Sequence, residues 1–182
     1  MIMARRVRFT KEKRMRPNFF VFCEGETEIA YIQYLRSKYR VPIQIIPRKS
    51  DSNISCRYIE NCKRDYELTD RDMTFLMYDL DVAGMFEKLK CIPDTTLLVS
   101  NPCIELWFLL HCRGFKVECN QQSCVKAYKS YSEHYSKGKL GIKDMQILAV
   151  GESDAVIRAK GLCSPSNPST TVYKLIEAIR EG

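Results

Sequence analysis

Residues 19–28 read FFVFCEGETE, and this stretch decides the fold. Its first five residues are apolar without alternation, which is typical of a parallel strand buried on both faces. The run ends at Glu24-Gly25, where a glycine permits a tight reversal of the chain. The apolar residues that follow have helical spacing: Ile29, Ile32 and Leu35. The stretch therefore predicts a strand, a turn and a helix over residues 26–38. Glu24 then stands at the carboxyl end of a central strand, where open α/β sheets bind their ligands.

The predicted turn is unusual because it carries three glutamates, Glu24, Glu26 and Glu28. A phosphate-binding loop would instead have glycines and a lysine, with bare N–H groups that face the anion. Three carboxylates repel a phosphate and attract a divalent cation. For Glu26 and Glu28 a second interpretation stays open, since carboxylates in the first turn of a helix also complement the helix dipole.

The composition indicates one globular domain, because 182 residues are enough to bury a sizeable core. No apolar run approaches the ~20 residues that a membrane helix needs, and the N-terminus lacks the apolar stretch of a secretory signal. The nine cysteines are odd in number and evenly spread, which favours reduced thiols. We therefore expect a cytoplasmic protein without a membrane partner.

The basic charge is concentrated in residues 1–16, which we expect to form a flexible N-terminal arm before a single domain over residues 17–182. The arm has seven basic residues against one glutamate, a net of +6, so that the total of +7 leaves +1 for the rest. Such an arm suits a polyanion such as DNA or RNA, although a solvated tail is an equally good interpretation. Its basic residues are Arg5, Arg6, Arg8, Lys11, Lys13, Arg14 and Arg16.

Further elements alternate along the chain. Strands are expected at residues 41–47, 73–78 and 95–99, and the prolines that flank the first of these favour an edge position. Asn101 and Pro102 predict a helix start, as N-cap and first helical residue, with the helix ending near Gly114. Residues 137–141 are expected to be a mobile basic loop. Other helices are expected at residues 54–66, 84–90, 153–160 and 172–180. This alternation predicts an α/β, Rossmann-like fold with a mainly parallel sheet of about four strands and helices on both faces.

A second pair of acids, Asp79 and Asp81, ends the buried strand at residues 73–78, as Glu24 ends the first strand. If the two strands are parallel neighbours, Glu24, Glu28, Asp79 and Asp81 converge at one edge of the sheet. Four carboxylates so close repel one another strongly, which favours protonation or a bound metal. Oxygen ligands without histidine or cysteine suit Mg²⁺ or Mn²⁺.

These residues resemble a known fold. A strand with Glu24-Gly25-x-x-Glu28, followed by a strand with Asp79-x-Asp81, resembles the Toprim fold of topoisomerases, bacterial primases and several nucleases. Two further stretches, SNPCIELWFLLH at residues 100–111 and NPSTT at residues 167–171, resemble the RloB-like family. Those are small Toprim proteins often associated with restriction and phage-defence loci. The resemblance covers about residues 18–180.

The resemblance implies metal-dependent, nuclease-type phosphodiester hydrolysis on nucleic acid in phage defence by abortive infection, with proteins of the same locus as possible partners. It implies that Glu24 is a general acid/base or metal ligand and that Asp79 and Asp81 hold the metal. Glu28, as a second catalytic acid, and Glu105, as a metal ligand, match more loosely. For Glu105 the helix dipole offers an equally good explanation. Besides the arm, Lys137 and Lys139 are expected to bind the nucleic-acid backbone.

Other interpretations remain at this point. No cation is clearly assigned to the site, and Lys143, Arg158 and Lys160 are the candidates. The fold also suits a non-catalytic module that binds nucleic acid or a partner protein, or a ribonuclease that processes RNA. The tyrosines at 128, 131 and 135 can stack on bases, but a partly buried helix face is favoured. A zinc site is disfavoured because its residues lack compact ligand spacing: His111, Cys112, Cys119, Cys124 and His134.

Overall fold

The computed structural model describes residues 17–47 and 54–181. The predicted basic arm and the loop at residues 48–53 lie outside the described residues. The described chain forms five strands, β1 Phe19–Cys23, β2 Ile43–Pro47, β3 Met73–Asp79, β4 Thr96–Asn101 and β5 Ser169–Thr170. They make one sheet in the order β2-β1-β3-β4-β5, in which only β5 is antiparallel. The mainly parallel sheet is confirmed, and β2 is an edge strand as its prolines predicted.

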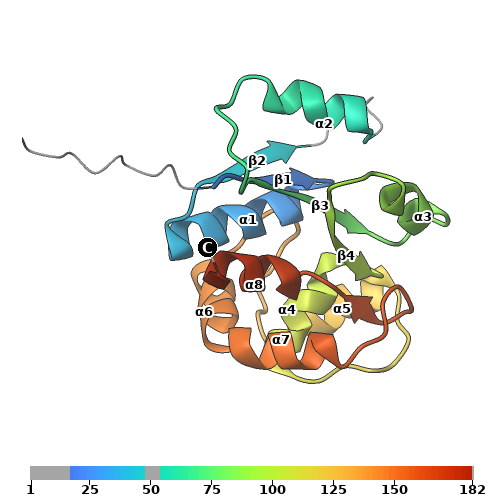
Figure 1. The fold of residues 1–182 in the computed structure, drawn as a ribbon. Helices are drawn as coiled ribbons and strands as arrows, with labels where there is room; N and C mark the ends of the chain where they lie inside the picture. The colour runs from blue at the N-terminus through green and yellow to red at the C-terminus, as the bar shows by residue number, and fades with distance from the viewer. Residues whose placement is uncertain (1–16, 48–53, 182) are drawn as a thin grey trace, which may run out of the picture.

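Eight helices connect and cover these strands in the described residues. They are α1 Glu26–Tyr39, α2 Cys56–Lys63, α3 Met85–Lys90, α4 Ile104–Cys112, α5 Gln121–Lys129, α6 Ile142–Val150, α7 Glu152–Lys160 and α8 Tyr173–Glu181. In Figure 1, α2 lies on one side of the sheet, whereas α1, α4 and α8 lie on the other. Helices on both faces of the sheet were expected from the alternation of elements, and this arrangement is confirmed.

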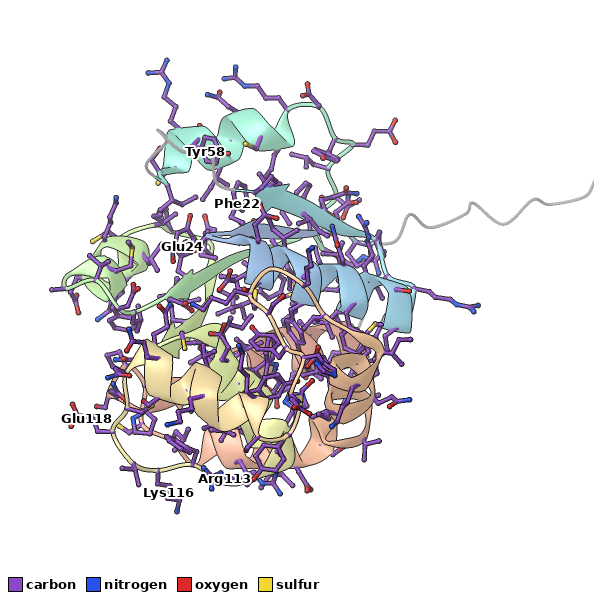
Figure 2. All side chains as sticks on the ribbon, turned by 180° about the vertical axis from the view of Figure 1, so that it is seen from behind. Phe22, Glu24, Tyr58, Arg113, Lys116 and Glu118 are labelled. Carbon is purple, nitrogen blue, oxygen red and sulfur yellow. The ribbon has the colours of Figure 1, made fainter. Side chains whose placement is uncertain are left out.

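Strand β1 shows why an unbroken apolar run was the right signal. Its odd positions, Phe19, Val21 and Cys23, pack into the larger core with α1 and α4. Its even positions, Phe20 and Phe22, pack into a second core with α2 and α3. Phe22 contacts Tyr58 of α2 with ring centroids 6.0 Å apart (Figure 2). Because alternate side chains of a strand point to opposite faces, a strand covered on both sides must be apolar throughout.

Helix α4 is buried along almost its whole length, from Ile104 to His111. The prediction of its start was wrong. Asn101 is the last residue of β4 rather than the N-cap, and Cys103 occupies the N-cap position. The reason is a long-range pairing: the backbone of Asn101 lies opposite Ser169 of β5, and its side-chain amide donates to the carbonyl of Pro165 at 2.8 Å.

The stretch at residues 167–171 closes the sheet at β4. The hydroxyl of Thr170 lies 2.9 Å from that of Ser100, and the Thr171 N–H donates to the Val99 carbonyl at 2.8 Å. The Asn167 side chain donates to the Cys119 carbonyl at 2.6 Å and accepts from its N–H at 3.1 Å. The two stretches that carried the family resemblance are therefore partners in space.

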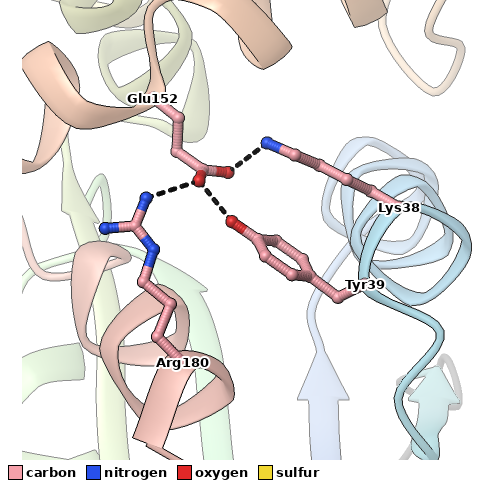
Figure 3. Close-up of polar contacts among 4 residues, drawn as sticks. All are labelled: Lys38, Tyr39, Glu152 and Arg180. Atoms are coloured by element: carbon pink, nitrogen blue, oxygen red, sulfur yellow. Dashed lines mark hydrogen bonds and ion pairs between the residues drawn. The ribbon is translucent and has the colours of Figure 1, made fainter.

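Glu152 joins three helices behind the sheet (Figure 3). Its carboxylate accepts hydrogen bonds from Lys38 at 2.6 Å, from Arg180 at 2.8 Å and from the Tyr39 hydroxyl. Burial opposes ionisation of this side chain, but the hydrogen bonds from Lys38 and Tyr39 and the charge of Lys38 outweigh it, so the pKa of Glu152 lies below its ordinary value. This buried charge is fully compensated.

One further element differs from expectation. Helix α6 was not predicted, since Ile142, Met145 and Val150 face outward and leave no clean apolar stripe. No helix in the described residues is both long and apolar enough to cross a membrane.

Candidate acidic active site

The ends of β1 and β3 meet directly. The two strands are parallel neighbours, with Cys23 opposite Met77, which confirms the expected pairing. The Glu24 N–H donates to the Met77 carbonyl at 3.1 Å, and the Asp79 N–H donates to Glu24 Oε2, also at 3.1 Å. The carboxylate of one strand end is thus fixed by the backbone of the other. Figure 2 shows Glu24 at the end of its strand.

A pocket of about 450 Å³ opens at this edge of the sheet. It is lined mainly by Glu24, Glu26, Asp79, Asp81, Gln121 and Lys137. A larger, open depression of about 660 Å³ lies at the amino ends of β1 and β2, beside Asn18 and Arg40. That depression gathers no buried charged group, so the acidic pocket is the candidate site.

Glu28 lies beneath the pocket in the first turn of α1, and only 5% of its surface is exposed. Its Oε2 atom is 2.9 Å from the point that a Cβ atom on Gly25 would occupy. An added Cβ would therefore require the Glu28 carboxylate to shift. The φ of Gly25 is −137°, which is extended backbone that any residue adopts, so glycine gives room at this turn rather than a special backbone conformation.

Glu105, from the first turn of α4, is 1% exposed and points into the same region. Its Oε1 accepts a hydrogen bond from the Tyr135 hydroxyl at 2.8 Å, and the Lys137 ammonium lies 3.9 Å from the same atom. Its Oε2 is buried and accepts no hydrogen bond within the described residues. A buried carboxylate oxygen without a partner is costly, unless a cation compensates it.

The buried carboxylates of the site raise one another's pKa values. Burial, together with the negative charges of Glu105 and Glu24, raises the pKa of Glu28 to about 7. Burial and then the charges of Glu28 and Glu105 raise the pKa of Asp79 to about 9. Both pKa shifts mean that, among the described residues, burial and carboxylate repulsion outweigh the positive charge near Glu28 and Asp79. The pKa of Glu152 is shifted in the opposite direction, because Lys38 and Arg180 pair with its carboxylate.

Lys137, which the sequence assigned only to the nucleic-acid backbone, is a cation that lines the acidic pocket. It comes from the loop at residues 137–141, which is anchored by the Gly138 N–H donating to the Thr27 hydroxyl at 2.9 Å. Gly138 has a φ of +79°, which favours glycine at this turn. Lys139, in the same loop, is exposed and does not line the pocket.

The other candidate cations lie elsewhere. Arg158 donates to the Leu110 carbonyl at 2.7 Å and pairs with Asp154, while Lys160 pairs with Glu177. None of Lys143, Arg158 and Lys160 lines the pocket. Sequence reasoning also missed Tyr135 and Gln121 as site residues. No local pattern marks either of them, because Gln121 reaches the pocket and Tyr135 reaches the Glu105 carboxylate only through the packing of the segment that follows α4.

The donor set fits a divalent cation in chemistry and charge. As the side chains stand, no three histidine, cysteine, aspartate or glutamate residues of the described chain are grouped so that they could hold a metal ion. Mg²⁺, however, is usually bound through one or two carboxylates, with waters and substrate phosphates completing its shell. Glu24 and Asp79 bring two carboxylates to this edge of the sheet, and the unpartnered oxygen of Glu105 and the raised pKa values favour added positive charge.

The alternative sites weighed from the sequence gain no support. The imidazole of His111 is buried and its Nδ1 lies 2.8 Å from the Trp107 carbonyl, and burial lowers its pKa to about 4. Cys119 and Cys124 lie near each other, but they form no metal-holding group with the other described residues. Tyr128 and Tyr135 are buried core residues, so their rings cannot stack on bases, and Tyr131 is half-buried. The expected helix face is wrong, because only Tyr128 lies in a helix, α5.

The comparisons with known proteins agree with this geometry at the level of the family. The sequence model of the RloB-like protein family matches residues 19–179, which include all five strands. No curated protein and no solved structure matches the chain. Since the match spans nearly the whole described structure, with the acidic pocket inside it, the chain belongs to the RloB-like protein family.

Proposed function

We propose that the chain hydrolyses phosphodiester bonds of nucleic acid with the help of Mg²⁺ or Mn²⁺. One observation carries the proposal: Glu24 and Asp79 meet at the ends of two parallel strands, above the buried Glu28 and Glu105, and burial among these carboxylates raises the pKa values of Glu28 and Asp79. A purely structural cluster would be compensated within the protein, as Glu152 is. The carboxylates of a site that binds a metal cation and a phosphate would lack such compensation until the cation binds.

Glu24 and Asp79 are the residues that we assign to the metal, with Asp81 at the rim and Glu105 below as further oxygen donors. Asp81 is exposed and lines the pocket, so it can approach an ion from the solvent side. When bound, a divalent cation neutralises a phosphate oxygen and lowers the pKa of a water molecule.

Other residues of the chain would act on the substrate or its proton. Glu28, or Glu24, would take the proton of the attacking water and return it to the leaving oxygen. Lys137 is 47% exposed and has its ammonium at the pocket, so it can pair with a phosphate oxygen that reaches the acids. Tyr135 would hold the Glu105 carboxylate in place through its hydroxyl.

The membership in the RloB-like family extends the proposal to phage defence by abortive infection, together with proteins of the same locus. DNA and RNA share the phosphodiester chemistry, and both are therefore included as substrates in the test. Protection of cells against phage by the wild type, and loss of that protection in Glu24→Gln, would support the role in phage defence.

The decisive experiment compares plasmid nicking and RNA cleavage by the wild type, Glu24→Gln and Asp79→Ala, with Mg²⁺, with Mn²⁺ and with a chelator. We expect metal-dependent cleavage that falls by about 100-fold or more in either variant, since both metal ligation and proton transfer suffer. Glu26→Gln is the matched control, because Glu26 lines the same pocket but is exposed. Unchanged activity in both site variants would refute the assignment. Metal binding without any cleavage would point to a non-catalytic module.

A further inference from the structure

A second hollow adjoins the acidic pocket. It measures about 340 Å³ and is lined by Gln121, Gln122, Val125, Lys126, Lys129 and Lys137. Gln121 and Lys137 line the acidic pocket as well, so the two depressions share a wall. The hollow lies along α5, the helix that packs beside α4 (Figure 1). Its charge is the reverse of that of the pocket, since three ammonium groups and no carboxylate line it.

The lysines of α5 are placed on one face of the helix. Gln122, Lys126 and Lys129 are four and three residues apart, so their side chains follow one another along the same side. Lys126 and Lys129 are separated by about 4.5 Å along the helix axis. Successive phosphates of one DNA strand advance by roughly 3.4 Å along the helix axis, so two ammonium groups at this axial spacing can pair with neighbouring phosphates.

These ammonium groups are available to a ligand. Both Lys126 and Lys129 are exposed, and neither forms an ion pair with an acid in the described part of the chain. Residues 17–182 carry a net charge of only +1, because 22 basic residues face 21 acidic ones. Three lysines in one hollow are thus a local concentration of charge, and it lies next to the site that needs a phosphate.

We propose that the hollow on α5 binds the phosphate backbone of the nucleic-acid strand next to the phosphate that enters the acidic pocket. This inference rests on the proposed function for the identity of the ligand. Lys137 would stand between the two phosphates, and Lys126 and Lys129 would bind the flanking ones. No aromatic ring lines the hollow, so the contact is with the backbone and is independent of base sequence.

The test measures binding of a fluorescent single-stranded oligonucleotide, as DNA and as RNA, to the full chain in a chelator, so that cleavage plays no part. The variant is Lys126→Gln with Lys129→Gln. The matched control is Lys116→Gln with Lys174→Gln, which removes the same charge from exposed lysines outside both depressions. Lys116 lies far from Glu24 in Figure 2. Unchanged melting temperatures would show that both double variants are folded.

We expect the salt dependence of the affinity, as the slope of log K against log salt, to fall by about 0.7 per lysine in the variant. That change corresponds to about fivefold in affinity per lysine at 0.1 M salt, and about 25-fold for the pair. The control pair should bind as the wild type does. Equal binding by variant and control would overturn the inference, as would a wild type that binds neither oligonucleotide.

Failure of the inference is separable from failure of the proposed function. If Glu24→Gln abolishes cleavage while Lys126→Gln with Lys129→Gln binds normally, the function holds and the hollow is not part of the substrate path. If the lysine variant loses binding while no condition yields cleavage, the hollow is a nucleic-acid surface and the proposed hydrolysis is wrong.

Discussion

Two buried acidic regions of this protein differ in how their charge is compensated. Glu152 receives three donors from α1 and α8, two of them cationic, and its pKa lies below the ordinary value (Figure 3). Within the described residues, Glu28 and Asp79 face other carboxylates, with Lys137 as the cation that acts on Glu28, and both pKa values are raised. The first region is complete without a ligand. The second would be completed by positive charge from outside, which is what distinguishes a site from a structural ion pair.

The largest loss of stability near Glu152 is expected from a substitution at its neighbour Gly151, where α7 packs against α4. A Cβ at Gly151 would lie 2.2 Å from the carbonyl oxygen of His111, a backbone atom that cannot move aside alone. We expect Gly151→Ala to lower the free energy of unfolding by about 3 kcal/mol, measured by urea denaturation. Gly161→Ala is the control, because its Cβ would approach Arg158 only to 3.4 Å. Equal stability of the two variants would contradict the close helix packing.

A smaller loss is expected from Glu152→Ala, which leaves Lys38 and Arg180 facing each other without their carboxylate. The loss should be about 2 kcal/mol at pH 7, less than for a fully buried pair because both cations are partly exposed. Asp154→Ala, on the exposed side of the same helix, should change stability by less than about 0.5 kcal/mol. Denaturant midpoints of the two variants decide the comparison.

Removing a carboxyl group from the acidic site should raise the free energy of unfolding, whereas removing Glu152 lowers it. Asp79→Asn should raise the stability of the chelator-treated protein by about 1 kcal/mol at pH 8, since an uncompensated group is removed. Mg²⁺ should raise the melting temperature of the wild type by preferential binding to the folded state, and should do so much less in Asp79→Asn. A destabilised Asp79→Asn would mean that the aspartate is compensated within the protein.

The pH dependence of the two regions should also be opposite. Glu28 has a folded pKa of about 7 against a reference value of 4.5, so the folded state holds its proton longer than the unfolded state. Stability from this group is present below pH 4.5 and falls as the pH rises toward 7. The gain from Glu28→Gln should therefore grow over that range.

For Glu152 the folded pKa is lowered, so its contribution is present above the unfolded value and is lost as the pH falls below it. The penalty of Glu152→Ala should then disappear in acid. Denaturation of both variants in a chelator between pH 3 and 8 checks the two trends. Parallel trends would remove the distinction between the regions.

The sequence predicted what depends on local chemistry. The apolar runs that became β1 and β3 are recognisable because both faces of a central strand are covered, and the acids stand out because they end those runs. It failed where distant segments decided the outcome. Asn101 has the signature of an N-cap, but its backbone pairs with β5, which follows in the chain only after α4 to α7. Helix α6 escaped detection because its outward apolar residues hide its periodicity.

By itself, the sequence determined the α/β alternation, the buried central strands and the acids placed at their ends, because each follows from neighbouring residues. Only the tertiary structure decided which groups share the pocket. Lys137 and Gln121 line it, and Lys137 and Tyr135 contact the buried Glu105, because α4, α5 and the loop that follows pack against the same end of the sheet. The charge balance that separates the site from the Glu152 region depends on those distances, and distances between remote side chains exist only in the folded chain.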